Sequence, residues 1–163
     1  MSLESVRAFF AEHAPDIGII SQDASTATVA EAAATLGVAP GQIAKTLSVR
    51  VNETVLLIVT RGDARLDNRK TKAAFGGRPR MLGADEVEAL TGHPVGGVCP
   101  FGLAGPLPVY CDVSLRDFEI VYPAAGSRTA SVRLSPDRLA ELTNARWVDI
   151  CQSPGSEDGP SAA

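Results

Sequence analysis

The sequence predicts an α/β fold of the α+β type, in which a mixed sheet is flanked by helices. Two observations lead to this prediction. First, 45% of the 163 residues are hydrophobic, and a chain of this size can bury a core without disulfide or metal staples. Second, the segments with helix and strand signals do not alternate strictly, as they would in a doubly wound parallel sheet.

Two helices are predicted before the first strand. Apolar residues over 3–10 recur at three- and four-residue spacing, which is typical of an amphipathic helix, and this helix has to end before Pro15. Residues 28–31 form a capping-box pattern ahead of an alanine-rich run, and Gly37 is a natural helix stop. The second helix is therefore predicted over 29–36.

A hairpin and a third helix follow. Apolar and polar residues alternate over 47–51, Asn52-Glu53 make a turn, and the apolar run within 54–60 indicates a buried central strand. Asp67 is a suitable N-cap for a helix that continues to about Ala74 and ends at two glycines.

A segment rich in glycine and proline, residues 92–108, comes next along the chain. A short strand over 80–82 and a helix over 84–90 precede it. Its composition excludes a regular helix or strand. Because loops of this length in a compact domain are usually functional or disordered, and because this one holds several apolar residues, we expect an ordered functional loop.

The C-terminal third is predicted to hold four strands and one helix. Ser135 suits the N-cap of that helix and Pro136 its first position. A tail over 152–163 has no apolar side chain larger than Ala, so we expect it to be disordered and to follow a single domain over 1–151. The expected elements are strands over 109–113, 119–122, 129–134 and 147–150 and a helix over 135–143.

Composition excludes several classes of protein. A net charge of -4 argues against a protein that wraps nucleic acid over its whole surface. Three cysteines without a Cys-x-x-Cys pair, and only two histidines, predict reduced thiols and no metal site. The aliphatic run over 55–59 is far shorter than the roughly 20 residues of a membrane helix, and no targeting pattern is present. We therefore expect a cytoplasmic protein with no membrane contact.

The average charge hides a basic window over 61–80. This window holds seven basic and two acidic residues, so its net charge is +5, and the rest of the chain carries -9. A solvated charged helix is one explanation. The alternative is a limited phosphate-binding patch, suited to the end of a nucleic acid. The candidate side chains are Arg61, Arg65, Arg69, Lys70 and Lys72.

Lys45 and two glycine-containing turns could carry chemistry. Lys45 stands at the mouth of a strand among apolar residues, either as a snorkelling side chain or as a partly desolvated charge that reaches a cleft. The backbone amides around Gly96-Gly97 and Gly126 could approach an anion or an oxyanion, although such glycines also serve simply to turn the chain.

Cys99 with His93 as its base is the alternative nucleophile, which would make the protein a thiol hydrolase. The loop between the two residues does not fix their geometry, and no acid that could orient the histidine is identifiable. We therefore treat this as the weaker hypothesis.

Four ordered motifs cover roughly residues 20–150. They are Thr28 to Ala33 with Gln42-Ile43-Ala44-Lys45-Thr46-Leu47, Gly62 to Asp67, Gly96 to Gly102, and Ala125-Gly126-Ser127-Arg128 with Ser135-Pro136. In this order they resemble the YbaK family, which comprises free-standing relatives of the editing domain inserted in bacterial prolyl-tRNA synthetases. The resemblance implies a mixed, largely antiparallel, curved sheet flanked by helices.

The activity that the resemblance implies is hydrolysis of the ester between a wrong small amino acid, such as Ala or Cys, and tRNA, with tRNA(Pro) as the expected tRNA. Editing of this kind is needed because a synthetase pocket excludes a slightly smaller amino acid by only about 10–200-fold. No cofactor is implied. The implied partners are the acceptor end of aminoacyl-tRNA and prolyl-tRNA synthetase, with no DNA. The rival hypothesis is a non-catalytic module of the same fold that binds a tRNA end or a nucleotide.

Lys45 matches the family's functional lysine, which implies an electrostatic role at the terminal phosphate or the ester carbonyl. Water would attack with help from the vicinal ribose hydroxyl, while glycine-loop amides stabilise the oxyanion. Cys99 would then shape the pocket and take no part in the attack. The substrate-binding residues implied are Thr46, Asp67, Gly96, Gly97, Cys99, Pro100, Gly126 and Ser127, and the tRNA-binding residues are Arg61, Arg65, Arg69, Lys70 and Lys72.

Overall fold

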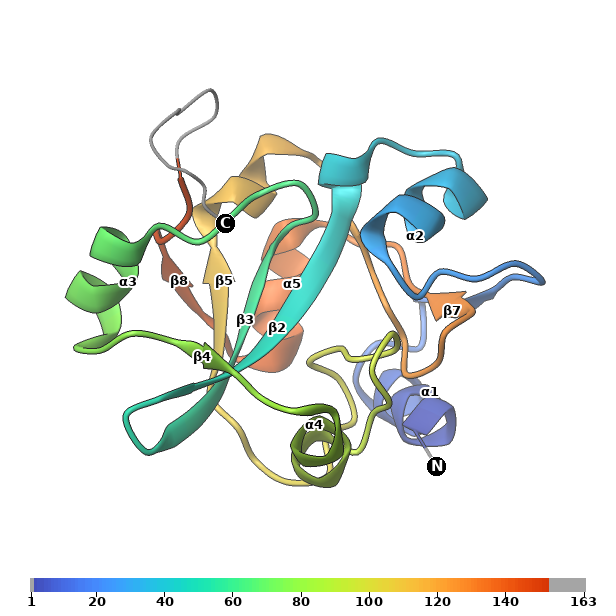
Figure 1. Cartoon of the computed structure of the whole chain (residues 1–163). Coiled ribbons are helices and arrows are strands. Elements are labelled where there is room, and N and C mark those ends of the chain that lie inside the picture. Colours follow the sequence, from blue (N-terminus) through green and yellow to red (C-terminus); the bar gives the residue numbers. More distant parts are fainter. Residues whose placement is uncertain (1, 153–163) are drawn as a thin grey trace.

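The computed structural model describes residues 2–152, and it confirms the predicted fold class (Figure 1). Of the predicted tail over 152–163, only residue 152 lies within this range, and residues 153–163 lie outside it. The helices are α1 (Ser2–His13), α2 (Val29–Leu36), α3 (Asn68–Phe75), α4 (Ala84–Thr91) and α5 (Pro136–Thr143). The strands are β1 (Ile20–Ser21), β2 (Ile43–Val51), β3 (Thr54–Arg61), β4 (Arg80–Met81), β5 (Val109–Asp112), β6 (Tyr122–Pro123), β7 (Ala130–Ser131) and β8 (Arg146–Val148).

Local signals set the ends of the helices that border the central hairpin. The Thr28 hydroxyl accepts a hydrogen bond from the Glu31 amide at the start of α2, and Gly37 ends this helix with φ at 73°. Asp67 caps α3 in the same way by accepting from the Lys70 amide, and Gly76 ends it. The sequence predictions for α2 and α3 are therefore confirmed, to within one residue at each end.

The sheet is built on the β2–β3 hairpin, whose strands pair from Ala44–Arg61 to Val51–Thr54. Strand order is β4-β2-β3-β5-β8, and β6 pairs with the start of β2. The β4 strand is antiparallel to β2, whereas β5, β6 and β8 join their neighbours in parallel. The mixed sheet is confirmed, with a larger parallel share than the sequence predicted, because crossovers that contain helices carry the chain to β5 and β8.

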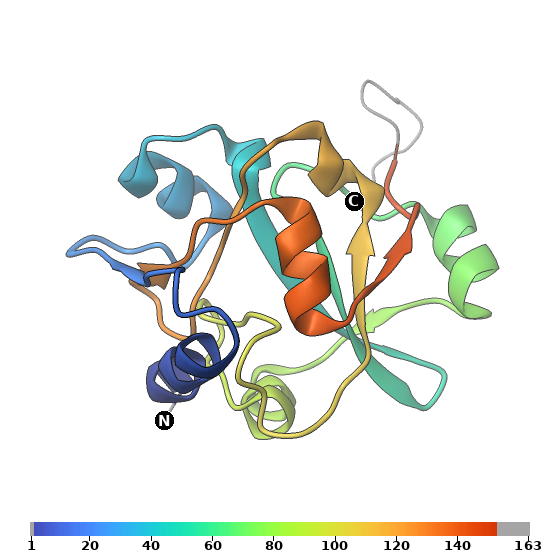
Figure 2. The same ribbon diagram turned by 180° about the vertical axis from the view of Figure 1, so that it is seen from behind.

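The two faces of the hairpin are buried against different helices. Leu57 and Val59 of β3 belong to the main core, which includes residues of α1 and α5. Leu56 and Ile58 alternate with them and pack on the opposite face with Phe75 of α3. Figure 2 shows α5 lying across the sheet on the side away from α3. The prediction of a buried second arm is confirmed, since residues 56–59 are all buried.

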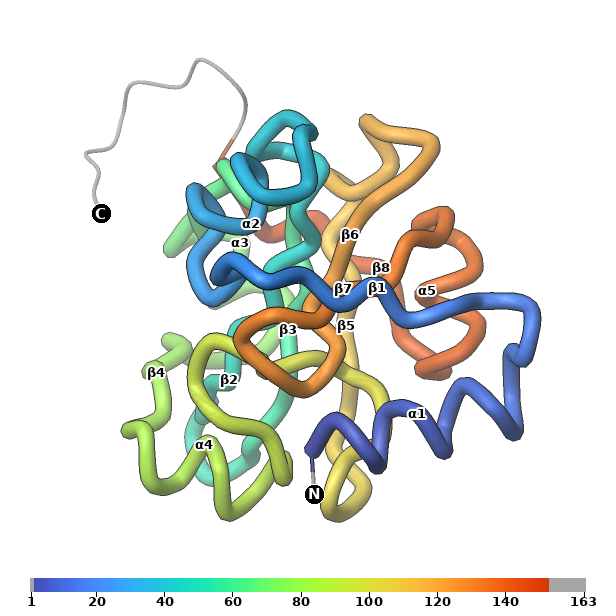
Figure 3. Tube along the Cα trace, turned by 90° about the vertical axis from the view of Figure 1, so that its right-hand side faces the viewer, coloured from blue at the N-terminus to red at the C-terminus, as the bar shows by residue number. Residues whose placement is uncertain are grey.

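The short strands near the C-terminus differ from their predicted lengths. The expected strand over 109–113 ends at Asp112, because a 3-10 turn begins at Val113. The strands expected over 119–122 and 129–134 shrink to β6 and β7, of two residues each. The β7 strand pairs with β1, which the sequence did not predict, and the two cross the molecule between α2 and α1 (Figure 3). The length of each of these strands depends on the strand with which it pairs, and that strand is distant in sequence.

The segment over 92–108 is ordered, as expected. Its Cys99 and Phe101 are fully buried in the main core. The Phe101 ring lies 4.7 Å from the Phe10 ring and 5.6 Å from the Phe9 ring of α1, measured between centroids. These contacts anchor the middle of the segment and leave the turn before it, around Gly96, at the surface of a cleft.

Candidate functional site

A cleft of about 240 Å³ opens between α2, the first half of β2, β4 and the glycine turn that carries Gly96. Tyr122 and Ser131 close it from the β6–β7 side. Most of the wall is made of small or aliphatic side chains, so the cleft favours a small apolar group. The aliphatic residues include Ala27, Val29, Ala32, Ala44, Leu82 and Val98.

Thr46 contributes an unpaired hydroxyl to this cleft. Its Oγ1 is the one buried side-chain nitrogen or oxygen in residues 2–152 with no hydrogen-bond partner. Neighbouring hydroxyls are occupied: Thr26 donates to the Arg128 carbonyl, and Thr28 caps α2. An unpaired buried polar group costs about 1–3 kcal/mol. A ligand that pairs with Thr46 would remove this cost.

The glycine turn has two backbone amides without a hydrogen-bond partner in the described residues, and both belong to residues that line the cleft. Gly96 adopts φ of 95°, a conformation that favours glycine. The Gly97 amide donates to the Pro94 carbonyl inside the turn, at 2.9 Å. By contrast, the amides of Gly96 and Val98 have no hydrogen-bond partner in the described part of the chain, and both residues line the cleft. These two amides, and not that of Gly97, can receive an anionic group.

Lys45 lies on the strand that separates two clefts. Side chains alternate along β2, so Lys45 faces away from Thr46 and toward its register partner Thr60. Its ammonium donates to the Ala64 carbonyl at 2.7 Å, and burial lowers the Lys45 pKa. The residue lines the first cleft and also a second one of about 290 Å³, which is bounded by Leu66. Because Lys45 borders both clefts, the conformation of its side chain determines which of them the ammonium group enters.

Gly97 and Gly126 hold the glycine turn against the segment between β6 and β7. The Gly126 amide donates to the Gly97 carbonyl at 3.0 Å, and a Cβ on Gly97 would lie 2.7 Å from the Ser127 amide nitrogen. Behind them, the Ser2 hydroxyl hydrogen bonds to the Gly126 carbonyl and lies 2.6 Å from His93 Nδ1. These residues shape the cleft from behind its wall.

The eight residues predicted to bind substrate therefore divide into two groups. Thr46 and Gly96 line the cleft. The other six lie outside its lining, because the sequence could not show which residues of each loop pack inward. Four of these are buried behind the wall, Ser127 bonds to the Thr129 amide, and Asp67 caps α3. The four buried residues are Gly97, Cys99, Pro100 and Gly126.

Cys99 is unsuited to be a nucleophile in this structure. The side chain is fully buried in the main core, and burial raises the pKa of its thiol to about 12. His93 Nε2 lies 3.6 Å from Cys99 Sγ but makes a shorter contact, 2.7 Å, with the Phe101 carbonyl. Burial also lowers the His93 pKa. The pair forms part of the core and does not meet the cleft.

Comparison with known proteins places the chain in a family. A model of the aminoacyl-tRNA editing domain matches residues 23–142. The chain belongs to the aminoacyl-tRNA editing domain family. The resemblance predicted from the four motifs is thereby confirmed.

Relatives of this editing domain match along most of its length. An uncharacterised Bacillus subtilis protein, YwhH, is 46% identical over 93% of this chain and 98% of its own. EbsC of Enterococcus faecalis, a candidate Cys-tRNA(Pro)/Cys-tRNA(Cys) deacylase, is 32% identical over 77% of this chain and 76% of its own. The crystal structure of a candidate trans-editing enzyme for prolyl-tRNA synthetase is 33% identical, with a TM-score of 0.85, over 93% of this chain and 98% of that one.

The basic window of the editing domain is only partly available to a ligand. Arg61 bonds Asp63 and Asp117, and its guanidinium lies 4.8 Å from the centre of the Phe118 ring. Lys70 bonds Asp149 and the Cys151 carbonyl. These two predicted tRNA-binding residues are therefore paired within the protein, and the partners Asp117 and Asp149 are distant in sequence.

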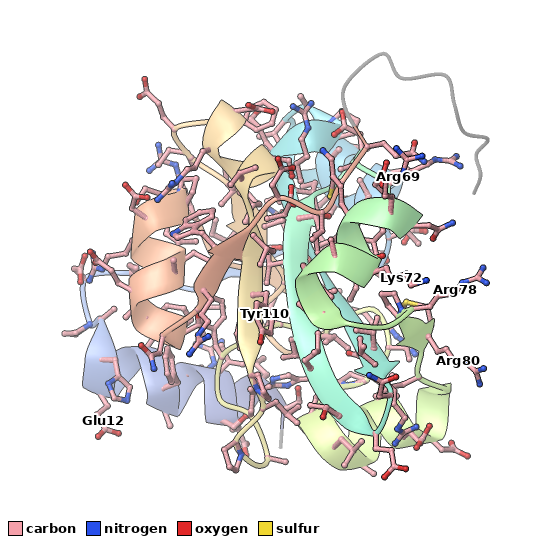
Figure 4. The ribbon with its side chains drawn as sticks, turned by 90° about the vertical axis from the view of Figure 1, so that its left-hand side faces the viewer. Glu12, Arg69, Lys72, Arg78, Arg80 and Tyr110 are labelled. Carbon is pink, nitrogen blue, oxygen red and sulfur yellow. The ribbon has the colours of Figure 1, made fainter. Side chains whose placement is uncertain are left out.

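Four other cations of this window form an exposed ridge. Arg69 and Lys72 of α3, with Arg78 and Arg80 at β4, point outward from one side of the molecule (Figure 4). None of them has an ion-pair partner within residues 2–152, and Arg65 is exposed nearby in sequence. Arg78 and Arg80 belong to the basic window over 61–80 but were not among its side chains predicted to bind tRNA.

The described part of the editing domain contains no helix that is both long and apolar enough to cross a membrane. Its three cysteines are free and buried. No group of three or more His, Cys, Asp and Glu side chains within residues 2–152 could hold a metal ion.

Replacing Gly97 with Ala should destabilise the editing domain by about 1–3 kcal/mol, because the new methyl group would overlap backbone atoms of Gly126 and Ser127. The measurement is the free energy of unfolding in urea. Gly105→Ala is the matched control, since a Cβ there meets no atom within 4 Å and should change stability by less than about 0.5 kcal/mol. Equal effects of the two substitutions would contradict the close approach of the two loops.

Proposed function

We propose that this editing domain is a trans-acting aminoacyl-tRNA deacylase that hydrolyses the ester of a mischarged small amino acid, such as Ala or Cys, with tRNA(Pro) as the favoured tRNA. The observation that carries the proposal is the cleft itself. It combines a small apolar wall with the unpaired Thr46 hydroxyl and the two free amides of Gly96 and Val98. The candidate activities of EbsC and of the solved trans-editing relative support it.

The proposed chemistry needs a place for negative charge and does not need a protein nucleophile. Water attacks the ester carbonyl with help from the neighbouring ribose hydroxyl, and the amides of Gly96 and Val98 receive the developing oxyanion. The Thr46 hydroxyl positions the ester by a hydrogen bond. A water nucleophile agrees with the buried, protonated state of Cys99.

Lys45 is proposed to stabilise the same negative charge from the end of β2. Its ammonium is half-buried and bonded to one carbonyl, so two N–H groups remain for a ligand. Because Lys45 lines both clefts, a turn of its long side chain toward the substrate would exchange the Ala64 carbonyl for the phosphate or the ester carbonyl. Desolvation strengthens the attraction of this charge for an anion.

The proposed partner is the acceptor end of an aminoacyl-tRNA, delivered in the cytoplasm by prolyl-tRNA synthetase. The ridge of Arg69, Lys72, Arg78 and Arg80 leads to the cleft, since Arg80 is followed by Met81 and Leu82, which line it. Phosphates bound along the ridge would therefore bring the 3′ end to the cleft mouth.

One observation favours the rival function, a non-catalytic module that binds a tRNA end or a nucleotide. The Lys45 ammonium bonds the Ala64 carbonyl and does not face Thr46. A panel of tRNAs charged with Ala, Cys, Ser, Thr or Pro separates the two functions. Release of at least one amino acid at a rate above the uncatalysed rate supports a deacylase. Retention of tRNA without release would support the rival.

Lys45→Ala should lower kcat/KM for deacylation by about 10²–10³, the effect of losing one group that stabilises an oxyanion. Lys45→Arg should not restore the rate, because the planar guanidinium cannot take the place of a point charge. Circular dichroism and thermal unfolding check that both variants fold. Wild-type turnover in Lys45→Ala would sink the proposed role.

Cys99→Ser should keep deacylation close to the wild-type rate, because the thiol is buried away from the cleft. The check is a single-turnover rate together with mass spectrometry of the protein during reaction. A loss of about three orders of magnitude, with an acyl-enzyme detected in the wild-type protein, would instead support a thiol hydrolase.

Replacing Arg69 and Lys72 together with Ala should raise KM for charged tRNA more than it lowers kcat, since these side chains would act in binding. The slope of log KM against log salt should become shallower by about 0.7–0.9 for each phosphate that the variant no longer binds. Arg7 and Arg133, two exposed arginines outside the ridge, provide the matched double control. Unchanged KM and salt slope would mean that the ridge is only a solvated face.

A further inference from the structure

Arg128 belongs to the segment between β6 and β7, and its side chain lies against the glycine turn that carries Gly96. Its Nε donates to the Val95 carbonyl at 2.9 Å. A Cβ on Gly96 would lie 3.1 Å from Arg128 Cγ and 3.2 Å from Nε, so the arginine stem crosses directly over this glycine. Val95 and Gly96 both line the cleft. The Arg128 side chain is therefore held against two residues of the cleft lining, one of which is Gly96.

The backbone of Arg128 is held in place as well as its side chain. Its carbonyl accepts hydrogen bonds from the Thr26 amide at 2.7 Å and from the Thr26 hydroxyl at 3.1 Å. Thr26 is buried and lines the cleft. A side chain fixed at both its base and its Nε loses little conformational entropy when it binds a ligand.

The terminal nitrogens of Arg128 remain available. Four other arginines of the molecule, at positions 50, 61, 116 and 138, are paired with carboxylates. Arg128 is exposed, and the Nε bond is its only side-chain hydrogen bond or ion pair within residues 2–152. The Nη1 and Nη2 groups of a guanidinium form a fork that suits two phosphate oxygens.

We propose that Arg128 binds the 5′-phosphate of the terminal nucleotide of the acceptor end. The assignment rests on the proposed function, which puts the aminoacyl ester in the cleft. The ribose then joins the ester to a phosphate that has to lie outside the cleft, near its mouth. Arg128 supplies a fixed cation against the glycine turn that lines the cleft, whereas the ridge of Arg69, Lys72, Arg78 and Arg80 is followed in sequence by Met81 and Leu82, which line the cleft at β4.

The test uses two hydrolysis-resistant probes, 3′-alanylamido-3′-deoxyadenosine with and without a 5′-phosphate. Calorimetry gives the affinity of each probe for the full-length protein. We expect the wild-type protein to bind the phosphorylated probe about tenfold more tightly, in line with a charge-assisted hydrogen bond at a partly exposed site. In Arg128→Ala the two probes should bind with about equal affinity. The affinity for the probe that lacks phosphate should be the same as in the wild-type protein.

Two further variants sharpen the test. Arg128→Lys should retain part of the preference, because it keeps the charge and loses the fork. Arg133→Ala, which removes an exposed arginine with no hydrogen bond to the described cleft residues Val95 and Gly96, should keep the full preference. No preference in the wild-type protein, or the same preference in Arg128→Ala, overturns the assignment.

Binding and turnover together separate this inference from the proposed function. A tenfold preference that depends on Arg128, in a protein that hydrolyses no charged tRNA of the panel, would support the phosphate site and overturn the deacylase. Hydrolysis of charged tRNA by a protein whose phosphate preference survives Arg128→Ala would support the deacylase and overturn the phosphate site.

Discussion

The close approach of two loops at Gly97 and Gly126 is the constraint on which the cleft depends. The two residues are 29 positions apart in sequence, yet the amide of one donates to the carbonyl of the other at 3.0 Å, with no room for a Cβ on Gly97. Gly96 and Val98, the residues on either side of Gly97, both line the cleft. The Ser2 hydroxyl ties α1 to the same point. The chemistry proposed for the amides therefore depends on packing behind them.

The alternation of β2 imposes a second constraint, because it assigns neighbouring polar residues to opposite faces of the sheet. Thr46 faces the apolar cleft, whereas Lys45 faces Thr60 and the Ala64 carbonyl. The long lysine side chain compensates for this placement, since a four-carbon stem at the edge of a strand can reach either side. Burial already lowers the Lys45 pKa, so the ammonium gains from an anionic partner. Substrate binding and the position of Lys45 are therefore expected to be coupled.

Sequence alone predicted the parts of the fold that local signals determine. The cap at Thr28, the stop at Gly37 and the apolar run of β3 act over a few residues, and these elements were placed correctly. The β6 and β7 strands were predicted too long because their pairing depends on β1 and β2, which are distant in sequence. The same distinction between local signals and tertiary packing applies to the candidate site. The glycine segment was predicted to be ordered, and it is, but which of its residues face the cleft depends on tertiary packing, as does the pairing of Lys70 with Asp149.

Charge distribution favours one region of the surface for the tRNA end that we propose as the partner. The sequence outside residues 61–80 carries a net charge of -9, so most of the surface repels a polyanion. Within the window, acidic partners neutralise Arg61 and Lys70, and the uncompensated charge is concentrated on α3 and β4. Arg128 adds one cation next to Val95, a residue of the cleft lining. A tRNA end bound as we propose, on the ridge and at Arg128, would pass over the cleft mouth and bring its terminal ester to the small apolar residues that line the cleft.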